Sequence, residues 1–159
     1  MSFADEPFCI GSLYLAGFAQ AVAPHVGLII PTSVDKGVLV HIRIDRNISP
    51  NWARQARTQN LSGDMFLTSL LKIGDCVPVD ALRNEAEQTT VPDNGEFGEC
   101  SVWVMKLVDR LNDKGLIHVA NLDALKQEFD VFVSGNRRYA RRDLFPNIAV
   151  SSFCGGQKE

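Results

Sequence analysis

The sequence predicts an α+β fold in which a small antiparallel sheet packs against a central helix that carries a cysteine at its N-terminus. Two observations predict the sheet. The runs at 25–31 and 37–45 are apolar and rich in β-branched residues, and only the short polar stretch TSVDK separates them. A third observation predicts the helix, because apolar positions recur at helical spacing over 100–113 and Gly115 follows as a stop.

Composition describes an ordinary globular protein. Hydrophobic residues make up 45% of the chain, charged residues make up 22%, and the net charge is −3. This balance gives no electrostatic reason to expect nucleic acid as a partner. The acidic start MSFADEPF lacks a secretory pattern and no apolar run is long enough for a membrane span, so we expect a cytoplasmic protein. Its 159 residues suit a single domain, 1–159, with mobile ends at 1–8 and 155–159.

The first half of the chain is expected to supply the strands. Residues 12–18 are rich in strand formers and small residues, which predicts a first strand. The runs 25–31 and 37–45 then form an antiparallel hairpin. Between Ile48 and Ser62 the sequence is polar and irregular, so we expect an excursion across the surface. Periodicity leaves the stretch 64–74 open between a strand and a helix, and of the two we expect a strand that ends at its terminal glycine.

The second half of the chain is expected to supply the helices. Residues 79–88 are rich in alanine and glutamate, and Asp80 is placed to cap their helix. After a break comes the central helix, which is apolar on most of its circumference and therefore central to the fold. A further helix is expected over 121–135, capped by Asn121 and ended by Gly135.

Two of the three histidines, His25 and His41, lie on the predicted hairpin. In a symmetric hairpin centred on residue 33 or 34, odd residues pair with odd residues, so both side chains project from the same face. Asp45 shares their parity. A hairpin centred on 33 places His41 opposite His25 and Asp45 out of reach, whereas one centred on 34 makes His41 and Asp45 equivalent diagonal neighbours of His25. The residue that orients His25 therefore stays open between the two.

Cys100 opens the predicted central helix. A thiol in a first turn meets unpaired amides and the positive end of the helix dipole, and both favour the thiolate. Packed on the sheet, this helix can bring the thiol to a histidine that takes its proton, while a second histidine fixes the tautomer of the first. The same amides face a developing oxyanion, so the combination predicts acyl transfer. The remaining cysteines are expected to be free thiols without a role: Cys9, Cys76 and Cys154.

The order of these motifs resembles the circularly permuted papain-like (NlpC-type) superfamily, in particular lecithin:retinol acyltransferase-like and PPPDE-type proteins. Those proteins carry a strand beginning HxG, a strand with a VxH-like element and a helix NCxxF, where this chain reads HVGLII, LVHIRI and ECSVW. The resemblance implies a permuted papain-like fold, with His25 as general base, His41 as orienting residue and Cys100 as nucleophile. The helix motif departs from the family at Glu99 and Trp103. The chain is also similar to short uncharacterised fungal proteins.

The function predicted first is a cysteine-dependent hydrolase or acyltransferase, without a cofactor, acting on an amide, ester or thioester of a small molecule or peptide through an acyl-enzyme on Cys100. A biosynthetic cyclase or tailoring enzyme can use the same site. The same residues are also consistent with a non-catalytic papain-like binding protein, or with a zinc site of two histidines and a cysteine. Arg138 and Arg141, beside Tyr139 in a basic segment, are candidates for binding an anionic group of the substrate, although such runs more often form a solvated surface.

Overall fold

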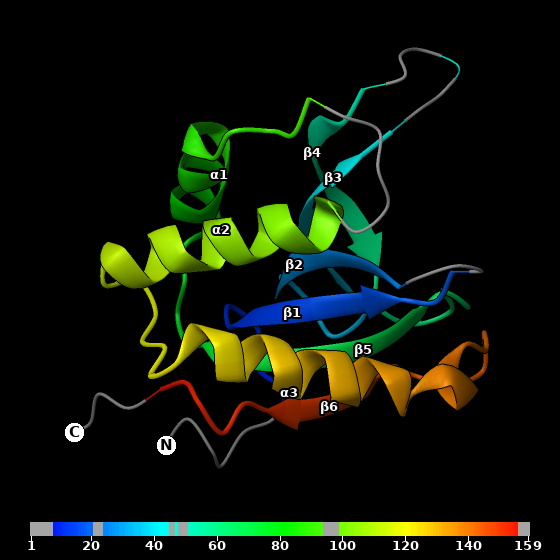
Figure 1. Ribbon diagram of the computed structural model, residues 1–159. Helices are drawn as coiled ribbons and strands as arrows, with labels where there is room; N and C mark the ends of the chain where they lie inside the picture. The colour runs from blue at the N-terminus through cyan, green and yellow to red at the C-terminus, as the bar shows by residue number, and fades with distance from the viewer. Residues whose placement is uncertain (1–7, 21–23, 45–46, 48–50, 94–98, 156–159) are drawn as a thin grey trace.

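Six strands form one mixed sheet in the computed structural model, which describes residues 8–20, 24–44, 47, 51–93 and 99–155. The strands are β1 (Leu13–Phe18), β2 (His25–Pro31), β3 (Lys36–Arg43), β4 (Ala53–Asn60), β5 (Leu67–Gly74) and β6 (Asn147–Val150). Their order is β4-β3-β2-β1-β5-β6, and β6 runs parallel to β5 whereas the other neighbours are antiparallel (Figure 1).

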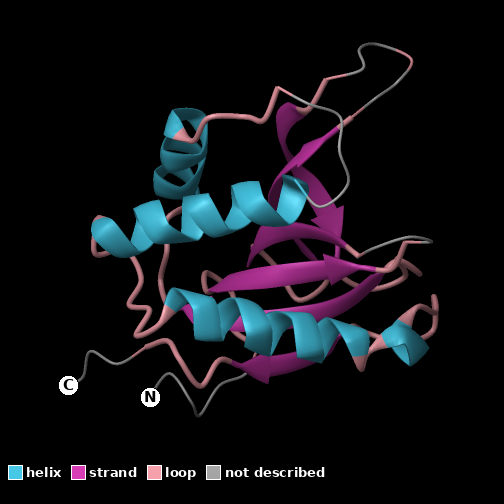
Figure 2. Cartoon of the chain, in the orientation of Figure 1, coloured by secondary structure: helices cyan, strands magenta, loops and turns pink. Residues whose placement is uncertain are grey.

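All the helices lie between β5 and β6 in the chain. These two strands are parallel, so a crossover connection has to join them, and the helices form that connection. They are α1 (Val79–Gln88), α2 (Glu99–Asp113), α3 (Leu122–Ser134) and the short 3₁₀ helix η1 (Arg137–Tyr139). Among the described residues, none of these helices has the length and apolar character needed to cross a bilayer. The crossover therefore serves to bring the helices back over the sheet (Figure 2).

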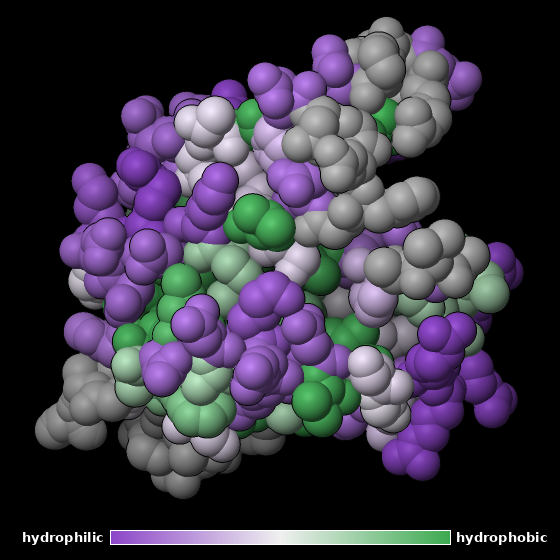
Figure 3. Space-filling view, viewed as in Figure 1, coloured by the Kyte–Doolittle hydropathy of each residue, from purple (hydrophilic) through white to green (hydrophobic). Residues whose placement is uncertain are grey.

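The three α-helices cover one face of the sheet, which we call the helix face. Alternate strand residues such as Leu15 and Leu28 point to it and pack with Trp103 of α2 in the larger apolar core. Seen from this side, hydrophilic side chains cover most of the helices, with smaller apolar patches among them (Figure 3). The opposite face carries a second apolar cluster around Tyr14 and Leu39, which includes no helical residue. Parity along β2 and β3 therefore decides on which side of the sheet a side chain lies.

The α+β class and most of the predicted elements are confirmed. The strands predicted at 12–18, 25–31, 37–45 and 64–74 and the helices predicted at 79–88, 100–113 and 121–135 correspond to β1, β2, β3, β5, α1, α2 and α3. The predicted cap of α3 also forms, because the Asn121 side chain accepts a hydrogen bond from the Ala124 amide at 3.0 Å. Gly135 follows α3 as its C-cap.

Three predicted details are wrong. The expected surface excursion over 48–62 contains β4, which pairs with β3 along its whole length, and no strand of the described residues pairs with its other edge. Its charged side chains are typical of an edge strand, where they oppose pairing with another chain. The sheet is mixed rather than antiparallel, because residues 147–150 form β6. Asp80 does not cap α1: Pro78 is the N-cap, without a side-chain hydrogen bond, and Asp80 lies in the first turn.

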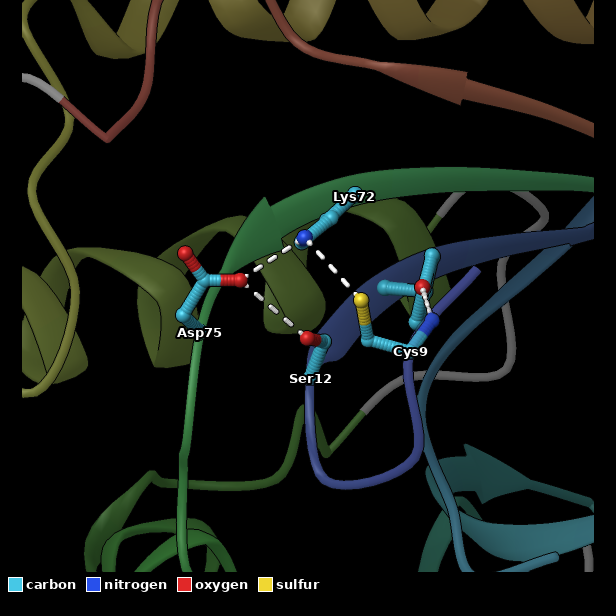
Figure 4. A network of polar contacts seen from close by, with 5 residues as sticks. Cys9, Ser12, Lys72 and Asp75 are labelled. Atoms are coloured by element: carbon cyan, nitrogen blue, oxygen red, sulfur yellow. Dashed lines mark hydrogen bonds and ion pairs between the residues drawn. The ribbon is translucent and has the colours of Figure 1, made fainter. Parts of the chain in front are cut away.

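One charged side chain, Lys72 of β5, is almost completely buried, with 1% of it exposed. Its Nζ lies 2.8 Å from Oδ1 of Asp75 and 3.6 Å from Sγ of Cys9 (Figure 4). The Ser12 hydroxyl donates to the same Asp75 oxygen at 3.2 Å. A buried ammonium is costly unless it is paired, so this ion pair offsets part of the cost of placing a lysine in a fully buried strand. In the described part of the chain, no disulfide joins any of the four cysteines.

Candidate functional site

His25 and His41 lie side by side on the face of the sheet opposite the helices. His25 Nε2 and His41 Nδ1 are 2.6 Å apart, and the two rings meet edge to face at 73°. The predicted shared face is therefore confirmed. The β2–β3 register pairs Leu28 with Val40, which centres the hairpin on residue 34 and makes the histidines diagonal neighbours. Asp45, the alternative orienting residue, lies outside the described residues.

Gly27 provides the space that this pair needs. A Cβ atom at this position would lie 2.7 Å from Cδ1 of Leu39 and 3.1 Å from Cβ of His41. Real Cβ atoms essentially never come as close as the first of these distances, so a side chain on residue 27 would displace its neighbours. The glycine thus lets the His41 side chain lie across β2 toward His25.

Gln55 determines which ring nitrogens carry protons. It pairs directly with His41 across β3 and β4, and its Oε1 lies 2.8 Å from His41 Nε2. Because a carbonyl oxygen only accepts, His41 Nε2 donates and His41 Nδ1 is left as an acceptor. His25 then donates its Nε2 hydrogen to that Nδ1. The Nδ1 of His25 has no hydrogen-bond partner among the described residues and keeps a lone pair that can take a proton.

Both imidazoles are neutral near pH 7. Burial, together with the positive charges of Arg43 and Arg57, lowers the pKa of His25 from 6.5 to about 4. Burial also lowers the pKa of His41 to about 4, against the opposing effect of its hydrogen bond to Gln55. The pair is therefore a neutral hydrogen-bonded relay rather than a cationic site.

These low pKa values predict that the protein loses stability as the pH falls from 6.5 to about 4. In that window the unfolded chain binds protons at both histidines while the folded chain does not, so acid favours unfolding. Below about pH 4 both states are protonated and this loss stops. Urea unfolding at a series of pH values measures it, and the variant His25→Gln/His41→Gln is the control that keeps every carboxylate. A wild-type pH dependence as shallow as that of the double variant would contradict the prediction.

A cavity of about 370 Å³ opens beside the histidine pair. Three apolar side chains form part of its wall: Phe18, Leu39 and Phe66. Its wall also includes five side chains with polar or charged groups: Gln20, His25, His41, Arg57 and Asp64. Large apolar side chains combined with convergent polar groups are typical of sites for small molecules, and this volume lies in their range.

The sequence analysis missed the residues that β4 contributes. Gln55 and Arg57 alternate along this strand and face the same side as His41 and Leu39, their partners in β3. The signal was the period of two in ARQARTQN, where Gln55, Arg57 and Gln59 share one parity. Few strand-forming residues accompany it, so the segment does not indicate a strand until its pairing is known.

Cys100 lies away from the histidine pair. It is 5% exposed and belongs to the core on the helix face, together with Val26 and Trp103. Burial raises the pKa of its thiol, and hydrogen bonding with the Val26 backbone opposes that rise only in part. The structure thus brings together two of the three predicted catalytic side chains and places the sheet between them and the third.

The zinc alternative meets the same obstacle. Its three ligands would be His25, His41 and Cys100, which lie on two faces of the sheet. In the described part of the chain, no group of three histidine, cysteine, aspartate or glutamate side chains stands close enough to hold a metal ion. The described residues therefore give no basis for a zinc centre of this composition.

Arg138 and Arg141, the residues proposed for substrate binding, do not line the cavity beside the histidines. The Arg138 guanidinium lies over the Tyr139 ring, 5.1 Å from its centroid. Arg141 donates two hydrogen bonds to the Asp143 carboxylate, at 2.8 and 2.6 Å, and lowers the pKa of that carboxyl. Its charge is thus already paired, and Arg57 is the arginine that faces the cavity.

Comparison with known proteins adds no further assignment. No model of a protein family, no curated protein and no solved structure matches this chain. The permuted papain-like architecture and the cysteine chemistry therefore remain predictions, and the function has to be inferred from the side chains around His25.

Proposed function

We propose that the chain is a hydrolase in which His25 activates water for attack on an acyl group of a small ester, amide or thioester. The observation that carries this proposal is a pair of hydrogen bonds that links Gln55 to His41 and His41 to His25. The two histidines lie in the wall of a cavity large enough for a small molecule. General bases in enzymes are most often histidines whose second ring nitrogen is held by an acceptor. Here His41 Nδ1 is that acceptor.

The reaction follows from the proton positions. A water molecule on His25 Nδ1 loses a proton to this nitrogen while its oxygen forms a bond to the acyl carbon. The imidazolium then gives the proton to the leaving oxygen, nitrogen or sulfur as its bond to the acyl carbon breaks. The products are a carboxylic acid and an alcohol, amine or thiol. Throughout the reaction His25 Nε2 donates a hydrogen bond to His41 Nδ1. This hydrogen bond stabilises the positive charge that His25 carries while it holds the proton of the water.

The low pKa of His25 gives this mechanism a distinctive pH dependence. The basic form of an imidazole with a pKa of about 4 is fully populated at neutral pH, so kcat/KM is expected to be flat between about pH 6 and 8. A reaction that used the thiolate of Cys100 would instead accelerate with rising pH, because burial raises the pKa of that thiol.

The experiment measures hydrolysis of p-nitrophenyl esters and of the corresponding thioesters by the wild-type chain and by single variants. His25→Ala is expected to lower kcat/KM by about 10²-fold or more, because a positioned base contributes that much. Cys100→Ala is expected to stay within about twofold of wild type, and so is His118→Ala, which changes an exposed histidine outside this cavity. The proposal fails if the wild type cleaves no substrate in the set, or if Cys100→Ala loses activity that His25→Ala retains.

A second candidate is the cysteine-dependent hydrolase or acyltransferase. It is supported by the place of Cys100 in the first turn of α2 and by the hydrogen bonding of its thiol with the backbone of Val26, which follows His25 in the chain. In this candidate the thiolate forms an acyl-enzyme, which a cyclase also requires. Acylation is detected as a burst of nitrophenol equal to the enzyme concentration and as an acyl mass added to Cys100. If neither the burst nor the added acyl mass is observed, the cysteine-dependent candidate is excluded. Ligand binding without any turnover favours a non-catalytic binding protein.

A further inference from the structure

Arg57 is a cation without an ion pair among the described residues. It lies on β4 opposite Leu39 and faces the cavity beside the histidines. Its Nη1 donates to the Thr58 carbonyl at 3.2 Å, and none of the described ion pairs includes it. This hydrogen bond does not use the edge of the guanidinium formed by Nε and Nη2. Such an edge can bind a carboxylate or a phosphate with two parallel hydrogen bonds.

Asp64, the acidic residue of the cavity, is held by other groups. One of its oxygens accepts a hydrogen bond from the Gln59 amide at 2.5 Å, and the other accepts from the Phe66 backbone at 2.8 Å. The carboxylate keeps its negative charge, but β4 and the loop after it hold both of its oxygens, and none of the described ion pairs joins it to Arg57. With both imidazoles neutral, the guanidinium is the group in this cavity wall that attracts an anion.

The other part of the wall is suited to an apolar group. Phe18 and Leu39 are buried, whereas Phe66 remains 54% exposed at the cavity. The neighbouring Met65 is also exposed, to 37%. Large apolar side chains left exposed around a cavity often mark the place where a ligand covers them.

We infer that this cavity binds a small anion with an apolar or aromatic body, whose carboxylate or phosphate pairs with Arg57 while its body packs against Phe66, Phe18 and Leu39. The inference names the substrate class of the proposed hydrolase, and it rests on that proposed function only in treating the bound anion as a substrate. The anionic group is a second group on the molecule, distinct from the acyl carbon that His25 and its water attack.

Binding of such an anion changes the histidine pair. The charged groups around it are Arg43, Arg57 and Asp64, and both arginines lower the pKa values of the two imidazoles. An anion on Arg57 cancels one of these positive charges, so both pKa values rise and His25 becomes a stronger base. The ligand and the proton therefore assist each other, because this coupling is reciprocal.

Phenylacetate and its uncharged analogue phenylacetamide test the inference on the full chain. Their affinities are measured by proton NMR of the imidazole C–H signals, assigned with the variants His25→Ala, His41→Ala and His118→Ala. Phenylacetate is expected to bind the wild type about tenfold more tightly than the amide, as a charge-assisted contact provides. It should shift the signals of His25 and His41, leave that of His118 in place, and raise the titration midpoints of the first two.

Two arginine variants on the same strand provide the matched comparison. Arg57→Met is expected to abolish the preference for phenylacetate over the amide. Arg54→Met removes an equal charge from the same strand, at a position whose side chain donates instead to the Thr89 carbonyl, and should leave the preference unchanged. Phe66→Ala should weaken the binding of both probes by a similar factor. Equal affinities for the two probes in the wild type, or an unchanged preference in Arg57→Met, would overturn the inference.

This failure is distinguishable from failure of the proposed hydrolase. The ester assay uses uncharged substrates, so hydrolysis that depends on His25 without any preference for anions would reject the substrate class and keep the function. Arg57-dependent anion binding without hydrolysis of any ester would support the anion site and reject the enzyme.

Discussion

Alanine in place of Trp103 is expected to lower the free energy of unfolding by about 4 kcal/mol. Trp103 is 0% exposed and is the largest fully buried side chain of the described residues. It lies on α2 and packs in the core on the helix face. Its truncation removes the burial of an indole, leaves a cavity that the neighbouring side chains fill only in part, and deletes the 3.1 Å hydrogen bond from Nε1 to the Thr89 carbonyl.

Phenylalanine at the same position separates these contributions. Trp103→Phe keeps most of the apolar volume, and the Thr89 carbonyl retains the hydrogen bond from Arg54 Nη1 at 3.3 Å. We expect it to cost about 1–2 kcal/mol, well below the cost of alanine. Urea unfolding followed by circular dichroism measures both variants. An alanine variant within about 1 kcal/mol of wild type would mean that α2 does not pack on the sheet through this residue.

The predictability of the histidine pair follows from the geometry of a hairpin. A short polar loop between two strand-forming runs predicts antiparallel pairing, and side-chain parity then predicts that His25 and His41 share a face. The register between the two strands stayed open, because a hairpin centred on residue 33 and one centred on residue 34 both place the two histidines on one face. The structure has the centre on 34, and this centre depends on how the chain turns at 32–36 rather than on either strand.

The position of Cys100 shows where that reasoning stops. Parity predicts which residues of a strand share a face, but it does not predict which face the helices will cover. The crossover between β5 and β6 decides this, and β6 comes from residues 147–150, which carry no strong strand signal. With the helices on the face of Leu28 and Val40, Cys100 packs there and the histidines lie on the other side. A sequence pattern therefore placed the pair correctly and left its relation to the helix undetermined.

Arg57 was beyond sequence reasoning for a different reason. Residues 53–60 form a strand because β3 offers a complete edge for hydrogen bonding, not because their own side chains favour an extended backbone. Tertiary pairing outweighs local propensity in such a segment. Gln55 and Arg57 acquire their orientation toward the cavity only through that pairing, so a site that includes them appears only once the sheet is known.

Removal of the Asp75 carboxylate is expected to cost about 2–3 kcal/mol of unfolding free energy, because the buried ammonium of Lys72 loses the ion pair with this carboxylate. The Nζ of Lys72 lies 2.8 Å from Asp75 Oδ1, and 1% of the Lys72 side chain is exposed (Figure 4). The Asp75 side chain itself is 33% exposed, so water replaces part of what the lysine loses. This partial exposure places Asp75→Ala at or below the lower end of the cost typical for breaking a buried pair.

Lys72→Met is expected to change stability by less than about 1 kcal/mol, because it removes the charge together with the cost of burying it and keeps an unbranched side chain of similar length. In this background Asp75→Ala should cost little, since no buried ammonium remains to be stranded. A double-mutant cycle in urea measures the difference as the coupling between the two residues. If Asp75→Ala costs the same with methionine as with lysine at position 72, the carboxylate acts instead through its hydrogen bond from Ser12, and the buried lysine is held by its other contacts, of which Cys9 Sγ is one.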